Sequence, residues 1–293
     1  LAGMIGCLPA FQSNQLIQIT GDLAFSEIEN FNILGGLVLA GITGLVVIGG
    51  LKRIAEVATF LVPLMGSIYF GAMVIALVLN LDLVLPAFKL ILVDAFNGTA
   101  IAGGTFFGVL IYGVRRGAFS NEAGMGTESL VHGVAKVSNP VKQGLVAMTG
   151  PIFDTLIICT ATALMILVSG VWETSSSQGV TLTAEAFSIL LGSFGGLILF
   201  TCVICFGLST IFTYSYYGAS CSRFLFGKFG MKFYIYLYIL SIFIYSIVPI
   251  DIAINIADGA FAMMAIPTLI SALWLAPKVM QASRNYFKLI DNN

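Results

Sequence analysis

Long apolar runs, separated by short polar connections, are the feature that most restricts how this chain can fold. A helix that crosses a bilayer needs about 20 mostly apolar residues, whereas strands of membrane barrels alternate over segments of about ten. Apolar residues make up 58% of the 293 residues and charged residues only 9%, although soluble domains carry about 25% charge. We therefore predict an all-α integral membrane protein with about eight transmembrane helices, at 9–20, 31–50, 57–80, 97–114, 145–170, 191–222, 233–250 and 252–277.

The charged residues give an independent test of this division. Lysines and arginines cluster in alternate connections, and Lys89 is the only basic residue elsewhere; the basic segments are 52–53, 115–142, 223–232 and the tail at 278–288. Connections between them are acidic or neutral, as expected when basic loops stay in the cytoplasm. We therefore expect the C-terminus to be cytoplasmic.

Several classes of function are disfavoured by what the chain contains. A net charge of −1, with no basic patch interleaved with aromatic residues, argues against a nucleic-acid partner. His132 is the only histidine, and Cys202 and Cys205 have no second cysteine pair nearby, which argues against a zinc site. Since hydrolase and zincin motifs are also missing, we predict that the chain is not an enzyme and needs no cofactor. A membrane-embedded enzyme remains a remote alternative.

A glycine-rich run precedes the most polar stretch of the chain. Residues 97–117 read NGTAIAGGTFFGVLIYGVRRG, and residues 113–126 read GVRRGAFSNEAGMG. Each glycine inside a helix costs about 1 kcal/mol relative to alanine. One interpretation is close packing of helices through small residues. The other is a break at Gly103-Gly104-Thr105, where freed backbone groups face a cavity, as in discontinuous transporter helices.

The polar stretch belongs to a set of motifs that closely resembles the sodium:alanine/glycine symporter family, of the amino acid-polyamine-organocation superfamily. The motifs are GGLKRIAEVATFLVPLMGSIYFG, GVRRGAFSNEAGMGTESLVHG, STIFTYSYYG and DIAINIADGAFAMMAIPTLI. The resemblance implies one transporter domain, 1–293, with the leucine-transporter fold of two inverted five-helix repeats whose first helices are broken. Residues 1–80 then match the last part of repeat one, and residues 97–285 match repeat two and the tail.

The function implied by this resemblance is sodium-coupled symport of alanine or glycine by alternating access, in the plasma membrane. The expected partners are a small neutral amino acid, membrane lipid and Na⁺ as the coupling ion. The chain resembles only the C-terminal part of a member, because the first broken helix would lie before Leu1. Leu8-Pro9, Glu128 and Thr268 also depart from the family pattern. A truncated fragment that is not competent for transport is therefore the alternative.

Candidate sodium and substrate residues follow from the same resemblance. Ser209 and Thr210 match the sodium-coordinating hydroxyl pair, although both hydroxyls could instead bond to the carbonyl four residues earlier. Tyr214 lies one turn beyond Thr210 on the same face and could contact the substrate. A break near Gly103 would offer backbone donors and acceptors to a zwitterion. The predicted substrate set is Gly103, Gly104, Thr105, Phe106, Phe107 and Tyr214.

The polar stretch itself is predicted to form a gate below that pocket. Its Asn and Glu can bond across to neighbouring helices, and its glycines permit close approach and hinging. Asp154 is either a structural anchor or a part of this gate paired with one of the two arginines. A buried carboxylate in a span needs a partner or a wet cavity, which applies to Asp258 as well. The predicted gate residues are Arg115, Arg116, Ser120, Asn121, Glu122 and Asp154.

Overall fold

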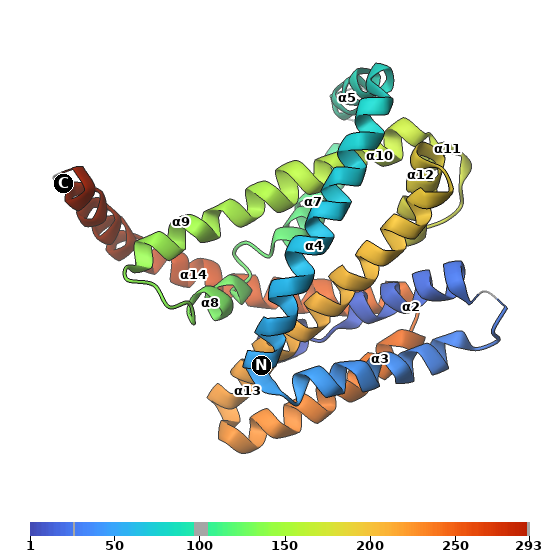
Figure 1. The fold of residues 1–293 in the computed structure, drawn as a ribbon. Helices are drawn as coiled ribbons and strands as arrows, with labels where there is room; N and C mark the ends of the chain where they lie inside the picture. The colour runs from blue at the N-terminus through green and yellow to red at the C-terminus, as the bar shows by residue number, and fades with distance from the viewer. Residues whose placement is uncertain (26, 97–104, 292–293) are drawn as a thin grey trace.

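The computed structural model describes residues 1–25, 27–96 and 105–291, and all regular structure in these ranges is helical (Figure 1). The all-α prediction is thus confirmed for this part of the chain. The elements are α1 (Ala2–Gly6), α2 (Ala10–Ala24), α3 (Phe31–Val47), α4 (Gly50–Leu79), α5 (Leu81–Ala95), α7 (Thr105–Asn121), α8 (Thr127–His132), α9 (Pro140–Pro151), the π-helical η1 (Ile152–Cys159), α10 (Thr160–Ser169), α11 (Val171–Thr174), α12 (Val180–Leu191), α13 (Ser193–Ile247) and α14 (Ile250–Asp291).

Four helical stretches among the described residues are long and apolar enough to cross a membrane, judged by length and composition. They are Arg53–Leu79, Pro140–Ser169, Ser193–Ile247 and Ile250–Ile290. Large apolar side chains such as Phe60, Leu273 and Trp274 point outward and are 70–80% exposed. Such surface suits lipid rather than water, so these features support a multi-pass membrane protein.

Two of the predicted spans, 191–222 and 233–250, correspond to the two parts of α13, which are separate helices joined by a kink. Gly227 interrupts α13 with φ 67° and ψ −159°, a conformation that residues with a Cβ rarely adopt. Figure 1 shows the chain doubling back there, at the lower left. The two helices on either side of Gly227 are therefore counted separately when they are compared with the predicted spans.

The predicted span 145–170 lies inside a helix that is continuous from Pro140 to Ser169 but contains the π-helical segment η1. Pro151 directly precedes this segment. Proline lacks the backbone N–H that an α-helix needs at an interior position, and π-segments are found mostly at functional sites. Asp154 and Thr155 lie in η1, so the irregular backbone is where two polar side chains are presented.

Two helices fall in segments that the hydropathy pattern assigned to connections. They are α5, which contains Pro86, and α12, which follows the turn at Gly179. Their 15 and 12 residues are too few for the run of about 20 used to identify spans. Among the elements that pack against α12 are α13 and α2, so this missed helix turns out to border the candidate site.

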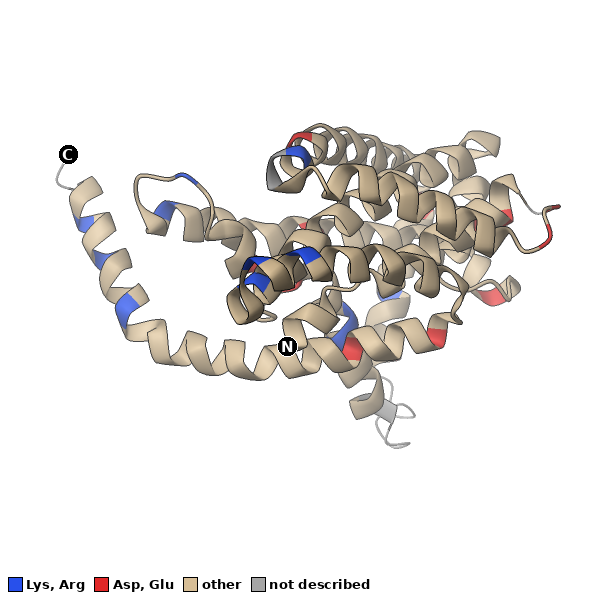
Figure 2. Ribbon diagram, turned by 90° about the horizontal axis from the view of Figure 1, so that it is seen from below, with Lys and Arg blue, Asp and Glu red and all other residues tan. Residues whose placement is uncertain are grey.

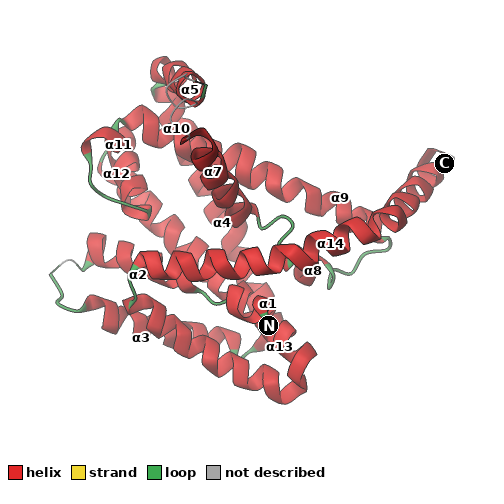
Figure 3. Ribbon diagram, turned by 180° about the vertical axis from the view of Figure 1, so that it is seen from behind, coloured by secondary structure: helices red, strands yellow, loops and turns green. Residues whose placement is uncertain are grey.

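Helix α13 is the centre of the packing and contacts α2, α3, α4 and α12. Ile211, Phe212 and Tyr238 are buried in the core cluster on one side of it, and Phe187 and Leu199 in a second cluster nearer α4. From behind, α14 crosses the molecule with α7 on one side and α1 on the other (Figure 3). Figure 2 shows lysine and arginine gathered toward the C-terminal side and most acidic segments toward the opposite side.

Candidate functional site

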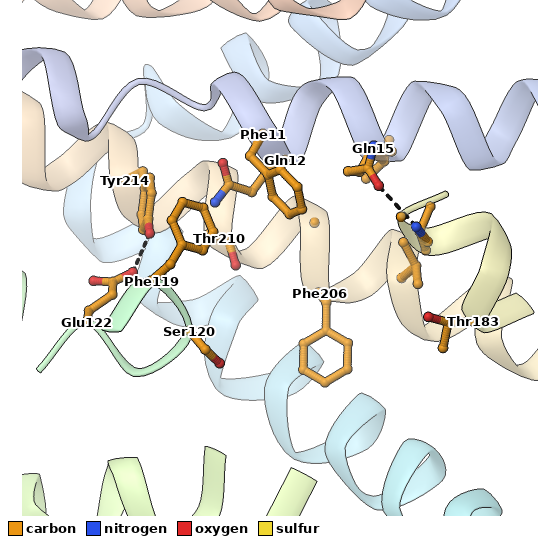
Figure 4. Close-up of a pocket in the computed structure, with 15 residues that line it drawn as sticks. Phe11, Gln12, Gln15, Phe119, Ser120, Glu122, Thr183, Phe206, Thr210 and Tyr214 are labelled. Atoms are coloured by element: carbon orange, nitrogen blue, oxygen red, sulfur yellow. Dashed lines mark hydrogen bonds between the residues drawn. The ribbon is translucent and has the colours of Figure 1, made fainter. Parts of the chain in front are cut away.

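A cavity of about 440 Å³ lies where α2, the end of α7, the start of α12 and the middle of α13 meet (Figure 4). Cavities of about 300–1,000 Å³ with a few convergent polar groups are typical of small-molecule sites. The lining combines aromatic and aliphatic side chains with hydroxyl, amide and carboxyl groups. It consists of Phe11, Gln12, Gln15, Leu16, Phe119, Ser120, Glu122, Gly179, Val180, Thr183, Val203, Phe206, Gly207, Thr210 and Tyr214.

The wall formed by α13 separates the two hydroxyls that were predicted to act as a pair. Thr210 lines the cavity, as does Tyr214 one turn later. Ser209 is buried, is not in the lining, and donates its hydrogen to the carbonyl of Phe206 at 2.9 Å. That acceptor lies three residues earlier in the helix. A hydroxyl that donates its hydrogen still has lone pairs, so coordination of a cation by Ser209 stays a prediction.

Three side chains at the end of α7 bond across to neighbouring helices. Ser120 Oγ donates to Asp154 Oδ2 at 2.6 Å, and Asn121 Nδ2 donates to Thr155 Oγ1 at 3.0 Å. The Tyr214 hydroxyl donates to Glu122 Oε1. These bonds join α7 to η1 and to α13, and they form the end of the cavity that we call the α7 end.

Glu122 has an unusual backbone as well as an unusual position. Its φ of 54° lies in the left-handed region, which costs non-glycine residues about 1–3 kcal/mol and persists where the surroundings enforce it. The residue stands in the turn after α7, outside the helices, and burial raises the pKa of its carboxyl. Glu122 and Ser120 also line a second cavity of about 300 Å³ that includes Glu128, His132 and Asp154. The Glu122 side chain thus stands between two cavities.

The opposite end of the main cavity, which we call the α12 end, is formed by a side-chain amide and a turn. Gln15 Oε1 accepts a hydrogen bond from the backbone N–H of Val180 at 3.1 Å. The preceding Gly179 has φ 62°, and a Cβ added there would lie 2.4 Å from Gln15 Oε1. Figure 4 shows this contact and the contact between Tyr214 and Glu122 at opposite sides of the cavity.

The two arginines of the predicted gate differ in their surroundings. Arg115 is exposed. Arg116 forms a salt bridge with Asp258 of α14, whereas Asp154 accepts hydrogen bonds from Ser120 and from Thr155, the latter at 3.1 Å. Asp154 is therefore joined to the α7 end by its bond to Ser120. Arg116 pairs with Asp258, the other carboxylate that the sequence analysis identified, and not with Asp154.

The remaining predicted substrate residues are placed as follows. Gly103 and Gly104 lie outside the described residues, and the side chains of Thr105 and Phe106, which begin α7, are not described either. Phe107 is 69% exposed and does not line the cavity. Phe119, three turns further along α7, does line it.

Sequence reasoning missed Gln15, Thr183 and Gly179 as parts of the cavity. A usable signal was present in α2, because Gln12, Gln15 and Gln18 recur every three residues in a predicted span. Polar residues inside a span usually face a pathway or a partner. Here Gln12 and Gln15 face the cavity, and Gln18 accepts a hydrogen bond from Gln15 Nε2 at 2.8 Å.

Comparison with known proteins adds to this geometry. A model of the sodium:alanine symporter family matches residues 1–293. The sodium/alanine symporter AgcS of Methanococcus maripaludis is 34% identical over 98% of this chain and 64% of its own length. Two Bacillus subtilis proteins, the uncharacterized transporter YflA and the probable sodium/glutamine symporter GlnT, are 36% and 33% identical over 90% and 93% of this chain, in each case 58% of their own length. The chain thus spans about three-fifths of the length of these relatives.

Proposed function

Because the chain belongs to the sodium:alanine symporter family, we propose that the complete protein carries a small neutral amino acid, alanine or glycine, across the membrane together with Na⁺. The observation that carries this proposal is the cavity at the meeting point of α2, α7, α12 and α13. It is of a size suited to a small molecule, and its polar groups come from four separate elements. Relative movement of those elements would therefore change the site, as alternating access requires.

The chemistry of the lining suits a small zwitterion. A substrate carboxylate needs donors, which the amides of Gln12 and Gln15 and the hydroxyl of Thr210 can supply. A substrate ammonium needs acceptors, which the amide oxygens and the Glu122 carboxyl can supply. The rings of Phe119 and Phe206 line the cavity and are the proposed limit on the substrate side chain, which would favour alanine and glycine over larger amino acids.

Na⁺ is a hard cation that prefers oxygen ligands, and Thr210 with Ser209 is the proposed source of two of them. One positive charge that moves through 100 mV gains about 2.3 kcal/mol, and a tenfold Na⁺ gradient adds about 1.4 kcal/mol. Coupling to one Na⁺ would therefore support accumulation on the order of a few hundredfold. The proposal includes the inverted-repeat fold, with residues 1–80 and 97–285 in different repeats, and a cytoplasmic C-terminus.

The test is uptake of radiolabelled alanine by cells that express the complete coding sequence, with cells carrying the empty vector as the control. We expect uptake that requires Na⁺, and that unlabelled alanine or glycine inhibits far more strongly than glutamine. Inhibition by glutamine at equal concentration would move the substrate class toward that of GlnT. Uptake that is undiminished when choline replaces Na⁺ would overturn the coupling.

A further inference from the structure

One face of α7 carries an arginine between two aromatic rings. Tyr112, Arg116 and Phe119 are spaced by four and three residues, so their side chains share a helix face. The Arg116 guanidinium carbon lies 5.5 Å from the centre of the Tyr112 ring and 5.4 Å from that of the Phe119 ring. Both distances lie within the range in which a cation is attracted to an aromatic face, about 6 Å.

Helix α14 holds this arrangement from the other side. Arg116 Nη2 donates to Asp258 Oδ2, and the Phe119 and Phe261 rings pack with centroids 5.2 Å apart. The two contacting residues are three positions apart in each helix, so together the contacts fix the register of α7 on α14. The Arg116 and Asp258 side chains are only 29% and 23% exposed, and such a partly desolvated pair is less screened than a surface pair.

Phe119 transmits this arrangement to the cavity. Its ring meets the Phe11 ring of α2 edge to face, with centroids 5.4 Å apart, and both rings are part of the lining. Figure 4 shows Phe119 beside Thr210 and Tyr214. The ring is therefore held by Arg116, by Phe261 and by Phe11, while part of it borders the space where a substrate side chain would lie.

We propose that Arg116 and Asp258 are positioning residues: their ion pair holds the Phe119 ring in the cavity wall and thereby sets the largest amino-acid side chain that the site accepts. This inference rests on the proposed function. Without the carboxylate, the guanidinium loses the contact that keeps it over the ring. The Phe119 ring can then turn away from the lumen, and the site gains room for a longer side chain.

The experiment compares Asp258→Asn and Arg116→Met with the parent protein. For each, the concentrations of alanine and leucine that halve uptake of labelled alanine are measured. We expect the leucine-to-alanine ratio of these concentrations to fall about tenfold in both variants, because a single methylene in an apolar pocket changes discrimination by about 10–200-fold. This ratio does not depend on the maximal rate of uptake, so a slower variant can still be compared with the parent.

Matched controls exist in the same helices. Asp251→Asn makes the same chemical change on an exposed residue of α14, and Arg115→Met makes the same change on the exposed arginine next to Arg116. Neither should change the ratio. Arg116→Lys keeps the charge but loses the planar group that stacks on a ring, and we expect a ratio between those of the parent and Arg116→Met.

Thermal stabilisation of the purified proteins by alanine and by leucine separates failure of this inference from failure of the proposed function. A parent that no amino acid stabilises would contradict the proposed function. A parent that alanine stabilises, together with variants that keep the parent's preference for alanine over leucine, would overturn the positioning role alone. If Asp258→Asn does not fold, the leucine-to-alanine ratios of Arg116→Lys and Arg116→Met still test the positioning role.

Discussion

The two ends of the cavity are held by different kinds of contact. At the α7 end, side chains bond to side chains: Tyr214 to Glu122, Ser120 to Asp154 and Asn121 to Thr155. At the α12 end, the side-chain amide of Gln15 meets the backbone of the turn at Gly179 and Val180. A hydrogen bond to a charged group contributes about 1.5–3 kcal/mol, and a neutral one about 0.5–1.5 kcal/mol. The α7 end therefore depends mainly on the carboxyl groups of Glu122 and Asp154, and the α12 end on the shape of the backbone.

This difference determines how each end of the cavity can open when the protein changes conformation. Several side chains hold the α7 end, and each can rotate to a new partner without a change in backbone. The α12 end relies on a φ that favours glycine and on a close approach to Gln15, so its shape depends on the backbone of the turn before α12. Four predictions, ordered by the stability expected to be lost with the contact that each removes, test this contrast.

Tyr214→Phe should lose the most stability through the contact that it removes. It removes the donor to Glu122 Oε1 and leaves a buried carboxyl without that partner, at a cost of about 1.5–3 kcal/mol. We expect the melting temperature of the purified protein to fall by roughly 3–12 °C. Tyr216→Phe, at a half-buried position of the same helix, serves as the control. Equal melting temperatures for the two variants would show that the bond to Glu122 adds nothing to stability.

Gly179→Ala should come next, because it combines a strained φ with a clash against Gln15. Gly192→Ala is the matched control: Gly192 has a similar φ of 68°, but a Cβ added there has nothing within 4 Å. Each is expected to lose about 1–3 kcal/mol through the backbone alone. The additional loss in Gly179→Ala, measured by chemical unfolding, should be about 0.5–1.5 kcal/mol, the value of a neutral hydrogen bond. No additional loss would mean that the α12 end is not held by Gln15.

Asn121→Ala should cost about 1 kcal/mol of stability and loosen the α7 end. Cys159 is a built-in reporter, since its Sγ lies 3.3 Å from Ser120 Oγ and the residue is half-buried. With the other four of the five cysteines replaced, alkylation of Cys159 should become faster in Asn121→Ala and in Glu122→Gln, and uptake should slow. Thr155→Val removes the same bond from its other side, together with the bond from Thr155 to Asp154, and should speed the alkylation of Cys159 at least as much. Slower uptake with unchanged alkylation, and with amino acid binding abolished, would place these residues in the substrate site instead of a gate.

Substitutions at Thr210 and Ser209 should hardly affect stability, yet they should change sodium dependence. Thr210→Val removes a hydroxyl that lines the cavity, and we expect the Na⁺ concentration for half-maximal uptake to rise about fivefold, which corresponds to one ligand worth about 1 kcal/mol. Ser209→Ala should produce a smaller rise, because that hydroxyl is buried behind the wall. If neither variant changes the sodium dependence, both hydroxyls are structural.

The sequence alone predicted the elements that depend on long apolar runs. The runs 31–50, 57–80 and 252–277 correspond to α3, α4 and α14, and only residues 48–49 and 80 of these runs lie outside the helices. The sequence did not predict α5 and α12, because their apolar runs are too short to be distinguished from connections. Asn121 and Glu122 were expected to bond to neighbouring helices, and they do, to Thr155 and Tyr214; the bond from Ser120 to Asp154 was not expected.

What the sequence by itself determined is therefore the helical, lipid-suited character of the chain, since composition and periodicity act within one segment. Only the tertiary structure decided which segments meet. Tyr214 lies 92 residues from Glu122, Asp258 lies 142 residues from Arg116, and Val180 lies 165 residues from Gln15. A helix face has the same pattern whichever helix covers it, so these pairings arise from the packing of whole helices against one another.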